Sequence, residues 1–141
     1  MKRILGIDYG GVRVGIAITD TLRITAQGLK TIVHNGNDKI LLTELDKILS
    51  EYDVETIVVG MPISMNGEST QRAEITKEFI HKLKCKYNKI KIETIDERLT
   101  TVMAESIIHQ NNENIKNSKK KIDSIAASII LESYLRGIKW Y

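Results

Sequence analysis

Hydrophobic and polar positions follow two different periods along this chain, and the changes between them divide it into predicted elements. Residues 3–7 form a short apolar run, and residues 12–19 place β-branched side chains at alternate positions, so both segments predict strands. They flank Asp8, Tyr9, Gly10 and Gly11, a pattern that indicates a β-hairpin. Further strands are predicted over 28–34, 56–60 and 89–95.

Apolar residues recur at helical spacing over 40–52 and 70–84, and these segments predict helices. Two more helices are expected near 102–110 and over 122–136, the second ended by Gly137, with a polar Asn/Lys loop between them. The order of elements predicts an α/β fold with a five-stranded mixed sheet: three antiparallel strands plus two parallel strands, with helices on both faces. Neither a linker nor an internal repeat interrupts residues 1–141, so we expect one domain.

Composition narrows the class of protein. The chain has 141 residues, of which 42% are hydrophobic and 28% charged, as expected for a globular domain with a hydrophobic core. No apolar run approaches the roughly 18 residues of a membrane span, and Asp8 comes too early for a signal peptide. The single Cys85 permits neither an intrachain disulfide nor a cysteine-based metal site. We therefore expect a cytoplasmic protein without a membrane partner.

The net charge of +3 decides little, but its distribution is more informative. Four lysines cluster just before the last predicted helix, at positions 116, 119, 120 and 121. Such a cluster is either a solvated basic loop or a contact for a nucleic-acid backbone, in which Lys120 and Lys121 would bind substrate. His34, His81 and His109 lack metal-ligand spacing, and we expect ordinary surface or helix positions for them.

Acidic residues occur where an open α/β sheet binds its ligands, at the carboxyl ends of parallel strands. Asp8 ends the first predicted strand, and Asp96 and Glu97 follow the last one. Asp123 lies in the first turn of the final predicted helix. Each has a local explanation: a turn for Asp8 or Asp96, a surface pair with Arg98 for Glu97, and a favourable helix dipole for Asp123.

Considered together, these acids indicate a metal site. Carboxylates held close together repel one another unless a cation intervenes, and hard oxygen ligands favour Mg²⁺ or Mn²⁺. A metal held in this way activates water and stabilises an in-line displacement at phosphorus. Gly10 and Gly11 would leave room beside Asp8 for a phosphodiester. We therefore predict a phosphodiesterase site that contains Asp8, Glu97 and Asp123, in which a metal-activated water replaces a general base.

Four segments of the chain, "GIDYGGVRVGIAITD", "VVGMPISMNG", "DERLTT" and "DSIAASIILESYL", resemble the landmark segments of the YqgF (RuvX) family. That family comprises bacterial pre-16S ribosomal RNA nucleases, also described as Holliday junction resolvases, with a ribonuclease H-like fold. The resemblance covers nearly the whole chain. It implies a metal-dependent nuclease that matures the 5′ end of small-subunit ribosomal RNA, with Asp8, Glu97 and Asp123 as catalytic and metal-binding residues.

The resemblance also implies substrate contacts. The family's loop corresponds to residues 60–67, and Asn66 and Gly67 would approach the substrate backbone. Arg72 and Arg98 would contact phosphates, or else form ion pairs on the surface. Related resolvases carry a fourth acid three residues before the last one, where this chain has Lys120, so the number of metal ions stays open.

Other functions fit parts of the pattern. A resolvase acting on branched DNA would need a symmetric dimer, whereas a ribosomal RNA nuclease could act as a monomer or weak homodimer. A non-catalytic RNA- or ribosome-binding module would share the fold. An actin-like or sugar-kinase-type ATP-binding protein shares the acid-and-glycine hairpin but needs a second such half, which this chain lacks. The glycine spacing fits neither a Rossmann nor a P-loop motif.

Overall fold

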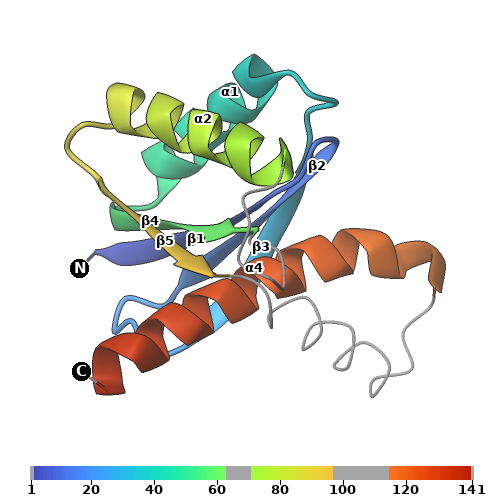
Figure 1. Cartoon of the computed structure of the whole chain (residues 1–141). Helices are drawn as coiled ribbons and strands as arrows, with labels where there is room; N and C mark the ends of the chain where they lie inside the picture. The colour runs from blue at the N-terminus through green and yellow to red at the C-terminus, as the bar shows by residue number, and fades with distance from the viewer. Residues whose placement is uncertain (1, 63–70, 97–114, 141) are drawn as a thin grey trace.

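The computed structural model describes residues 2–62, 71–96 and 115–140. Figure 1 shows a central sheet with helices on two sides. In chain order the elements are β1 (Arg3–Tyr9), β2 (Arg13–Thr19), β3 (Ala26–Val33), α1 (Asp38–Glu51), β4 (Val54–Met61), α2 (Gln71–Lys86), β5 (Lys91–Asp96) and α4 (Ile115–Trp140). The helix predicted near 102–110 lies outside the described residues. None of the described helices contains a segment long and apolar enough to cross a membrane.

The sheet has five strands in the order β3-β2-β1-β4-β5. β1 and β2 form the predicted antiparallel hairpin, and β3 pairs antiparallel with β2. β4 runs parallel to both β1 and β5, so the carboxyl ends of these three strands lie at one edge of the sheet. The five-stranded mixed sheet predicted from the sequence is confirmed.

The strands bury different residues on their two faces because successive side chains point in opposite directions. On one face Leu5 and Ile7 of β1 belong to a core that also contains Leu45 of α1 and Phe79 of α2. On the other face Ile4 packs in a second core with residues of α4. The ribbon in Figure 1 shows α1 and α2 together on one side of the sheet and α4 on the other. The prediction of helices on both faces is therefore confirmed.

Small residues let α4 approach the sheet closely. A Cβ built on Gly15 of β2 would lie 1.9 Å from the backbone oxygen of Asp123, and one on Gly6 would lie 2.6 Å from Leu131 Cγ. Real atoms do not approach so closely, so α4 can occupy this position only because residues 6 and 15 have no side chain. The packing of α4 is thus fixed by glycines on the first two strands.

α4 is longer than predicted. It begins at Ile115, and the part of the predicted Asn/Lys loop from that residue onward is helical. Lysine is a good helix former, so a lysine-rich segment is compatible with this extension. Gly137 does not end the helix, which continues to Trp140, because glycine inside a helix costs only about 1 kcal/mol. The other described elements begin and end within two residues of their predicted bounds.

Candidate active site

Two of the predicted acids, Asp8 and Asp123, lie on the same face of the sheet. Asp8 belongs to β1, which continues to Tyr9, and it pairs across the hairpin with Gly15. Directly opposed residues of paired strands point to the same face, and the backbone of Asp123 lies over Gly15 on that face. Both acids are half-buried, and the charge of Asp8 raises the pKa of Asp123. Strand pairing and close helix packing thus bring together carboxylates from opposite ends of the chain.

The carboxylate of Asp123 has an unusual environment. Burial is the largest cause of its raised pKa, which Asp8 raises further and Arg13 opposes. Arg13 Nε lies 2.9 Å from Asp123 Oδ2, and this contact is an ion pair. Within the described part of the chain, however, the buried Oδ2 receives no hydrogen bond of good geometry. A buried carboxylate oxygen in this condition, next to a second carboxylate, suits a hard divalent cation.

The third predicted acid, Glu97, lies outside the described residues, as do Arg98, Asn66 and Gly67. β5 ends at Asp96, which is exposed and pairs with Met61 at the end of β4. β5 therefore ends at the same edge of the sheet as β1. Among the residues that the structure describes, no three His, Cys, Asp or Glu side chains form a metal-binding group. Glu97 as a metal ligand remains a prediction.

The two glycines of the hairpin turn have different surroundings. A Cβ on Gly10 would lie 2.4 Å from the carbonyl oxygen of Arg13, so the tight turn itself requires glycine there. No described atom lies within 4 Å of a Cβ built on Gly11. Only Gly11 thus has the open space expected for an approaching phosphodiester, and a contact of either glycine with substrate remains a prediction.

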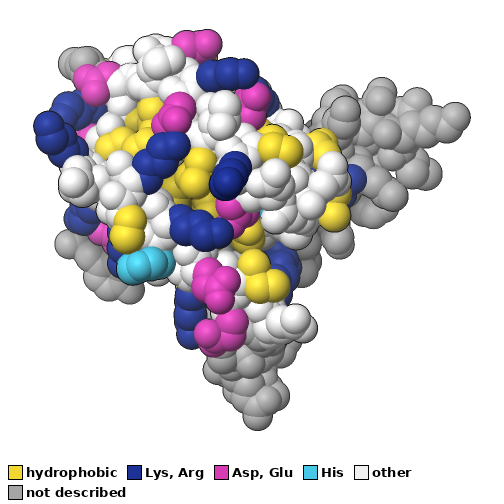
Figure 2. Space-filling view, turned by 90° about the horizontal axis from the view of Figure 1, so that it is seen from above, with side chains coloured by type: hydrophobic (Ala, Val, Ile, Leu, Met, Phe, Trp, Pro, Cys, Tyr) yellow, Lys and Arg dark blue, Asp and Glu magenta, His cyan; other side chains and the backbone are white. Residues whose placement is uncertain are grey.

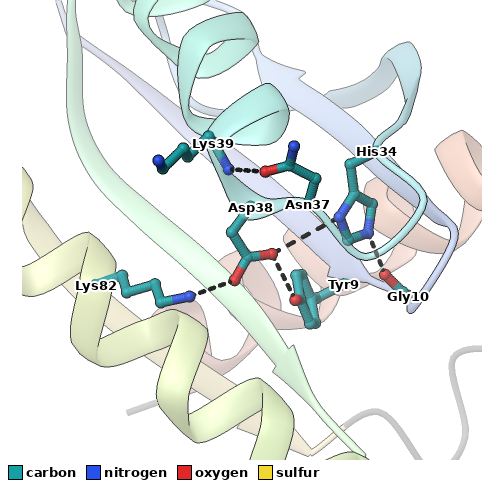
Figure 3. Close-up of polar contacts among 7 residues, drawn as sticks. All are labelled: Tyr9, Gly10, His34, Asn37, Asp38, Lys39 and Lys82. Atoms are coloured by element: carbon teal, nitrogen blue, oxygen red, sulfur yellow. Dashed lines mark hydrogen bonds and ion pairs between the residues drawn. The ribbon is translucent and has the colours of Figure 1, made fainter.

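A buried polar network holds this turn from the α1 side (Figure 3). His34 donates from Nε2 to the carbonyl oxygen of Gly10 at 2.6 Å, and its side chain is fully buried. The Tyr9 hydroxyl donates to Asp38 Oδ1 at 2.7 Å, and Lys82 Nζ donates to Asp38 Oδ2 at 2.9 Å. Burial and the neighbouring Asp38 carboxylate raise the pKa of Tyr9. The network therefore ties the residues that follow Asp8 to helices α1 and α2.

The prediction that His34 occupies an ordinary surface or helix position is wrong, because it lies outside the helices and is buried against the hairpin. Asn35 and Gly36, both with positive φ, reverse the chain after His34. Asn37 then caps α1 by accepting a hydrogen bond from the Lys39 backbone N–H at 3.1 Å. His81 is exposed on α2, as predicted, and His109 lies outside the described residues. The sequence gives no signal for His34 because the carbonyl that it binds is far away in the chain.

Of the basic residues predicted to bind substrate, Arg72 is the one whose side chain is described. It is exposed near the start of α2 and lines a pocket of about 230 Å³ with Tyr9, Gly11, Gln71 and Ile75. Lys120 and Lys121 belong to α4, but their side chains lie outside the described part of the structure. Arg72 therefore lies close to the hairpin turn, and its contact with phosphate remains a prediction.

Comparison with known proteins identifies the family. The RuvX family, described as Holliday junction resolvase, matches residues 2–137. This chain belongs to the RuvX family. A relative from Acetivibrio thermocellus is 44% identical over 135 residues, with 94% of each chain covered, and one from Ruminiclostridium cellulolyticum is 46% identical over 140 residues, with 96% of this chain and 95% of the relative covered. Both carry the name "Putative pre-16S rRNA nuclease".

Solved structures of similar shape establish the ribonuclease H-like fold of this RuvX chain. Thermus thermophilus RuvC in complex with a Holliday junction substrate has a TM-score of 0.57 at 10% identity, with 97% of this chain and 96% of that chain covered. The fowlpox virus Holliday junction resolvase has a TM-score of 0.58 at 16% identity, with 96% and 99% covered. At these identities the similarity concerns the fold alone. The fold predicted from the four sequence segments is confirmed.

Proposed function

We propose that this chain is a metal-dependent nuclease that hydrolyses phosphodiester bonds during 5′-end processing of pre-16S ribosomal RNA. Its membership of the RuvX family and the names of its relatives support nuclease activity. The observation that carries the assignment to a site is the approach of Asp123 to Asp8 across Gly15. The two acids lie at the end of β1, at the sheet edge where open α/β folds bind ligands.

Asp8 and Asp123, together with Glu97, would hold the divalent cation, for which we propose Mg²⁺ or Mn²⁺. The buried Asp123 Oδ2 and the neighbouring Asp8 carboxylate fit such an ion, since both are hard oxygen donors. A cation bound there would stabilise the negative charge that develops on the phosphodiester and would activate water for attack. Arg13 neutralises part of the charge on Asp123 and orients its carboxylate in the absence of the ion.

The products follow from the bond that hydrolysis breaks. Water attacks phosphorus in line with the departing 3′-oxygen, so the proposed products carry a 5′-phosphate and a 3′-hydroxyl. Residues at and beside the hairpin turn keep the phosphodiester that is cut accessible. Gly11 presents no side chain at the turn after Asp8, while the hydrogen bond from His34 to Gly10 holds the backbone of that turn in place.

A second candidate function is cleavage of branched DNA. The RuvX family is described as Holliday junction resolvase, and this description favours that alternative. Paired incisions would require a symmetric dimer, whereas we expect a monomer or weak homodimer for a nuclease acting on ribosomal RNA. We also propose that the protein is cytoplasmic and that residues 1–141 form one domain.

An end-mapped cleavage assay tests the proposal. Purified protein is incubated with a ribosomal precursor RNA and with a four-way DNA junction in Mn²⁺ and in EDTA. We expect cleavage of the precursor in Mn²⁺ only, and its loss in the Asp8→Asn variant. Asp46→Asn is the matched control, since Asp46 pairs with Lys86 and Tyr87 away from the hairpin. Cleavage that persists in Asp8→Asn would refute the site, and binding without cleavage of either substrate would indicate a non-catalytic module.

A further inference from the structure

A pocket beside the candidate active site is lined by aromatic, aliphatic, amide and basic side chains rather than by carboxylates. It has a volume of about 230 Å³ and is lined by Tyr9, Gly11, Gln71, Arg72 and Ile75. Tyr9 directly follows Asp8, so their side chains point to opposite faces of the same strand end. The pocket therefore opens at the end of β1 where Asp8 lies, but on the face covered by α1 and α2.

One wall of the pocket is apolar and rigid. The Tyr9 ring stacks on Phe79 with 4.4 Å between ring centroids, and its hydroxyl donates to Asp38 at 2.7 Å. These two contacts hold the ring by one of its faces and by its hydroxyl group. Gly11 leaves the mouth open, because no described atom comes within 4 Å of a Cβ built there. Tyr9 is only 6% exposed, so a ligand would meet a small part of this ring, held in place before binding.

The opposite wall comes from α2 and combines an exposed apolar side chain with polar groups. Residues 71, 72 and 75 lie on one side of the helix. Ile75 is 44% exposed and adds an apolar surface to this wall, while Arg72 and Gln71 add a planar cation and an amide. Figure 2 shows the molecule from the side of α1 and α2, where hydrophobic side chains reach the surface among both basic and acidic residues.

These features match a nucleobase. A base has apolar ring faces, for which the exposed Ile75 side chain provides the main contact and Tyr9 a minor one, and polar edges that an amide or guanidinium can bind. The pocket is smaller than the roughly 300–1,000 Å³ of sites for drug-sized ligands, so it suits a single ring system rather than a whole dinucleotide. The positive charge of Arg72 is complementary to a polyanionic strand that crosses the turn.

We propose that this pocket binds the base of an unpaired nucleotide next to the phosphate that is cut. The inference rests on the proposed nuclease function and specifies its substrate: the strand must be single-stranded at this position, because a base inside a duplex cannot enter a pocket. The strand would cross the end of β1 over Gly11, with its scissile phosphate on the side of Asp8 and the neighbouring base on the side of Tyr9.

The test removes the base from the substrate and the apolar contact from the protein. A short single-stranded RNA spanning the mapped cut is compared with versions that carry an abasic nucleotide at each position beside the cut. Binding is measured with wild type, Ile75→Ala and Ile40→Ala in Ca²⁺, and cleavage in Mn²⁺. Ile40 on α1 is the matched control, since it is 43% exposed and does not line the pocket.

We expect one abasic position to weaken binding by wild type about 5-fold, the lower end of the range for loss of one base–aromatic stack, because the exposed apolar contact comes mainly from an aliphatic side chain. Ile75→Ala should bind the intact RNA more weakly and respond less to that abasic position, whereas Ile40→Ala should behave as wild type. Equal sensitivity of Ile75→Ala and wild type, or no sensitive position, would overturn the inference. These outcomes are read from binding, so they differ from failure of the proposed function, which would appear as absent cleavage.

Discussion

The backbone carbonyl oxygen of Asp123 lies only 1.9 Å from the position that a Cβ on Gly15 would occupy. Gly15 is the cross-strand partner of Asp8, so the residue that admits α4 is also the residue opposite the first acid. The distance between the two acids therefore depends on the absence of a side chain at position 15.

Replacement of Gly15 by alanine should push α4 away from the sheet. The added methyl would collide with backbone rather than with a flexible side chain, so we expect a loss of stability of about 1–3 kcal/mol or more. Cleavage should fall as well, because Asp123 moves away from Asp8. Chemical denaturation and the cleavage assay measure the two effects. Gly11→Ala is the control for stability alone, since its methyl meets open space, and equal stability of the two variants would contradict this account.

The pKa of Asp123 should move in opposite directions when its two charged neighbours are removed. Asp8→Asn should lower this pKa, and Arg13→Gln should raise it further. In wild type the raised pKa means that the folded chain retains a proton above the ordinary value of 3.8. Through the Asp123 carboxyl, the free energy of unfolding therefore falls as the pH rises from 3.8 through the raised pKa. Asp8→Asn should reduce this fall. Carboxyl NMR titration in metal-free buffer measures the pKa directly, and shifts of the same sign would contradict the geometry.

Tyr9→Phe keeps the ring stack on Phe79 but removes the hydrogen bond to Asp38. Because this bond is partly buried and its acceptor is charged, we expect a loss of about 1–3 kcal/mol. Tyr87→Phe removes a similar bond to Asp46, but that pair is exposed, so water can replace the lost partner and the cost should be smaller. Urea denaturation of both variants gives the comparison. A larger loss for Tyr87→Phe would show that the Tyr9 network contributes little to the fold.

A divalent cation should stabilise the folded chain, since unfolding separates the acids that bind it. At one hundred times its dissociation constant, Mn²⁺ should add about 2.7 kcal/mol. Thermal unfolding should therefore shift upward with Mn²⁺ in wild type and in Asp46→Asn, and return to its starting value in EDTA. Asp8→Asn should show a much smaller shift. An equal shift in Asp8→Asn would place the bound ion elsewhere.

The sheet could be predicted from the sequence because each strand has a local signal. The alternation in β2, the apolar run of β4 and the glycines between β1 and β2 are all readable within a few residues. The edge at which β1, β4 and β5 end follows from their parallel pairing, and with it the region where ligands bind.

Other features depend on contacts between distant segments and could not be predicted. His34 has no local sign of burial, since its partner is the Gly10 carbonyl on another strand. Gly15 reads as one small residue in a strand, and its role appears only when α4 lies over it. The sequence predicts too late a start for α4, because a lysine-rich segment can form either a loop or a helix.

The helix that packs on one face of the sheet also carries Asp123, whereas Asp8 lies in the first strand. During translation, the ribosome therefore makes the carboxylate of Asp8 long before that of Asp123. Until α4 has emerged from the exit tunnel and docked, a nascent chain holds only one member of the pair. The second core and the acidic pair are thus completed in the same step, when α4 packs on the sheet. Any activity of the site therefore begins only after folding is complete.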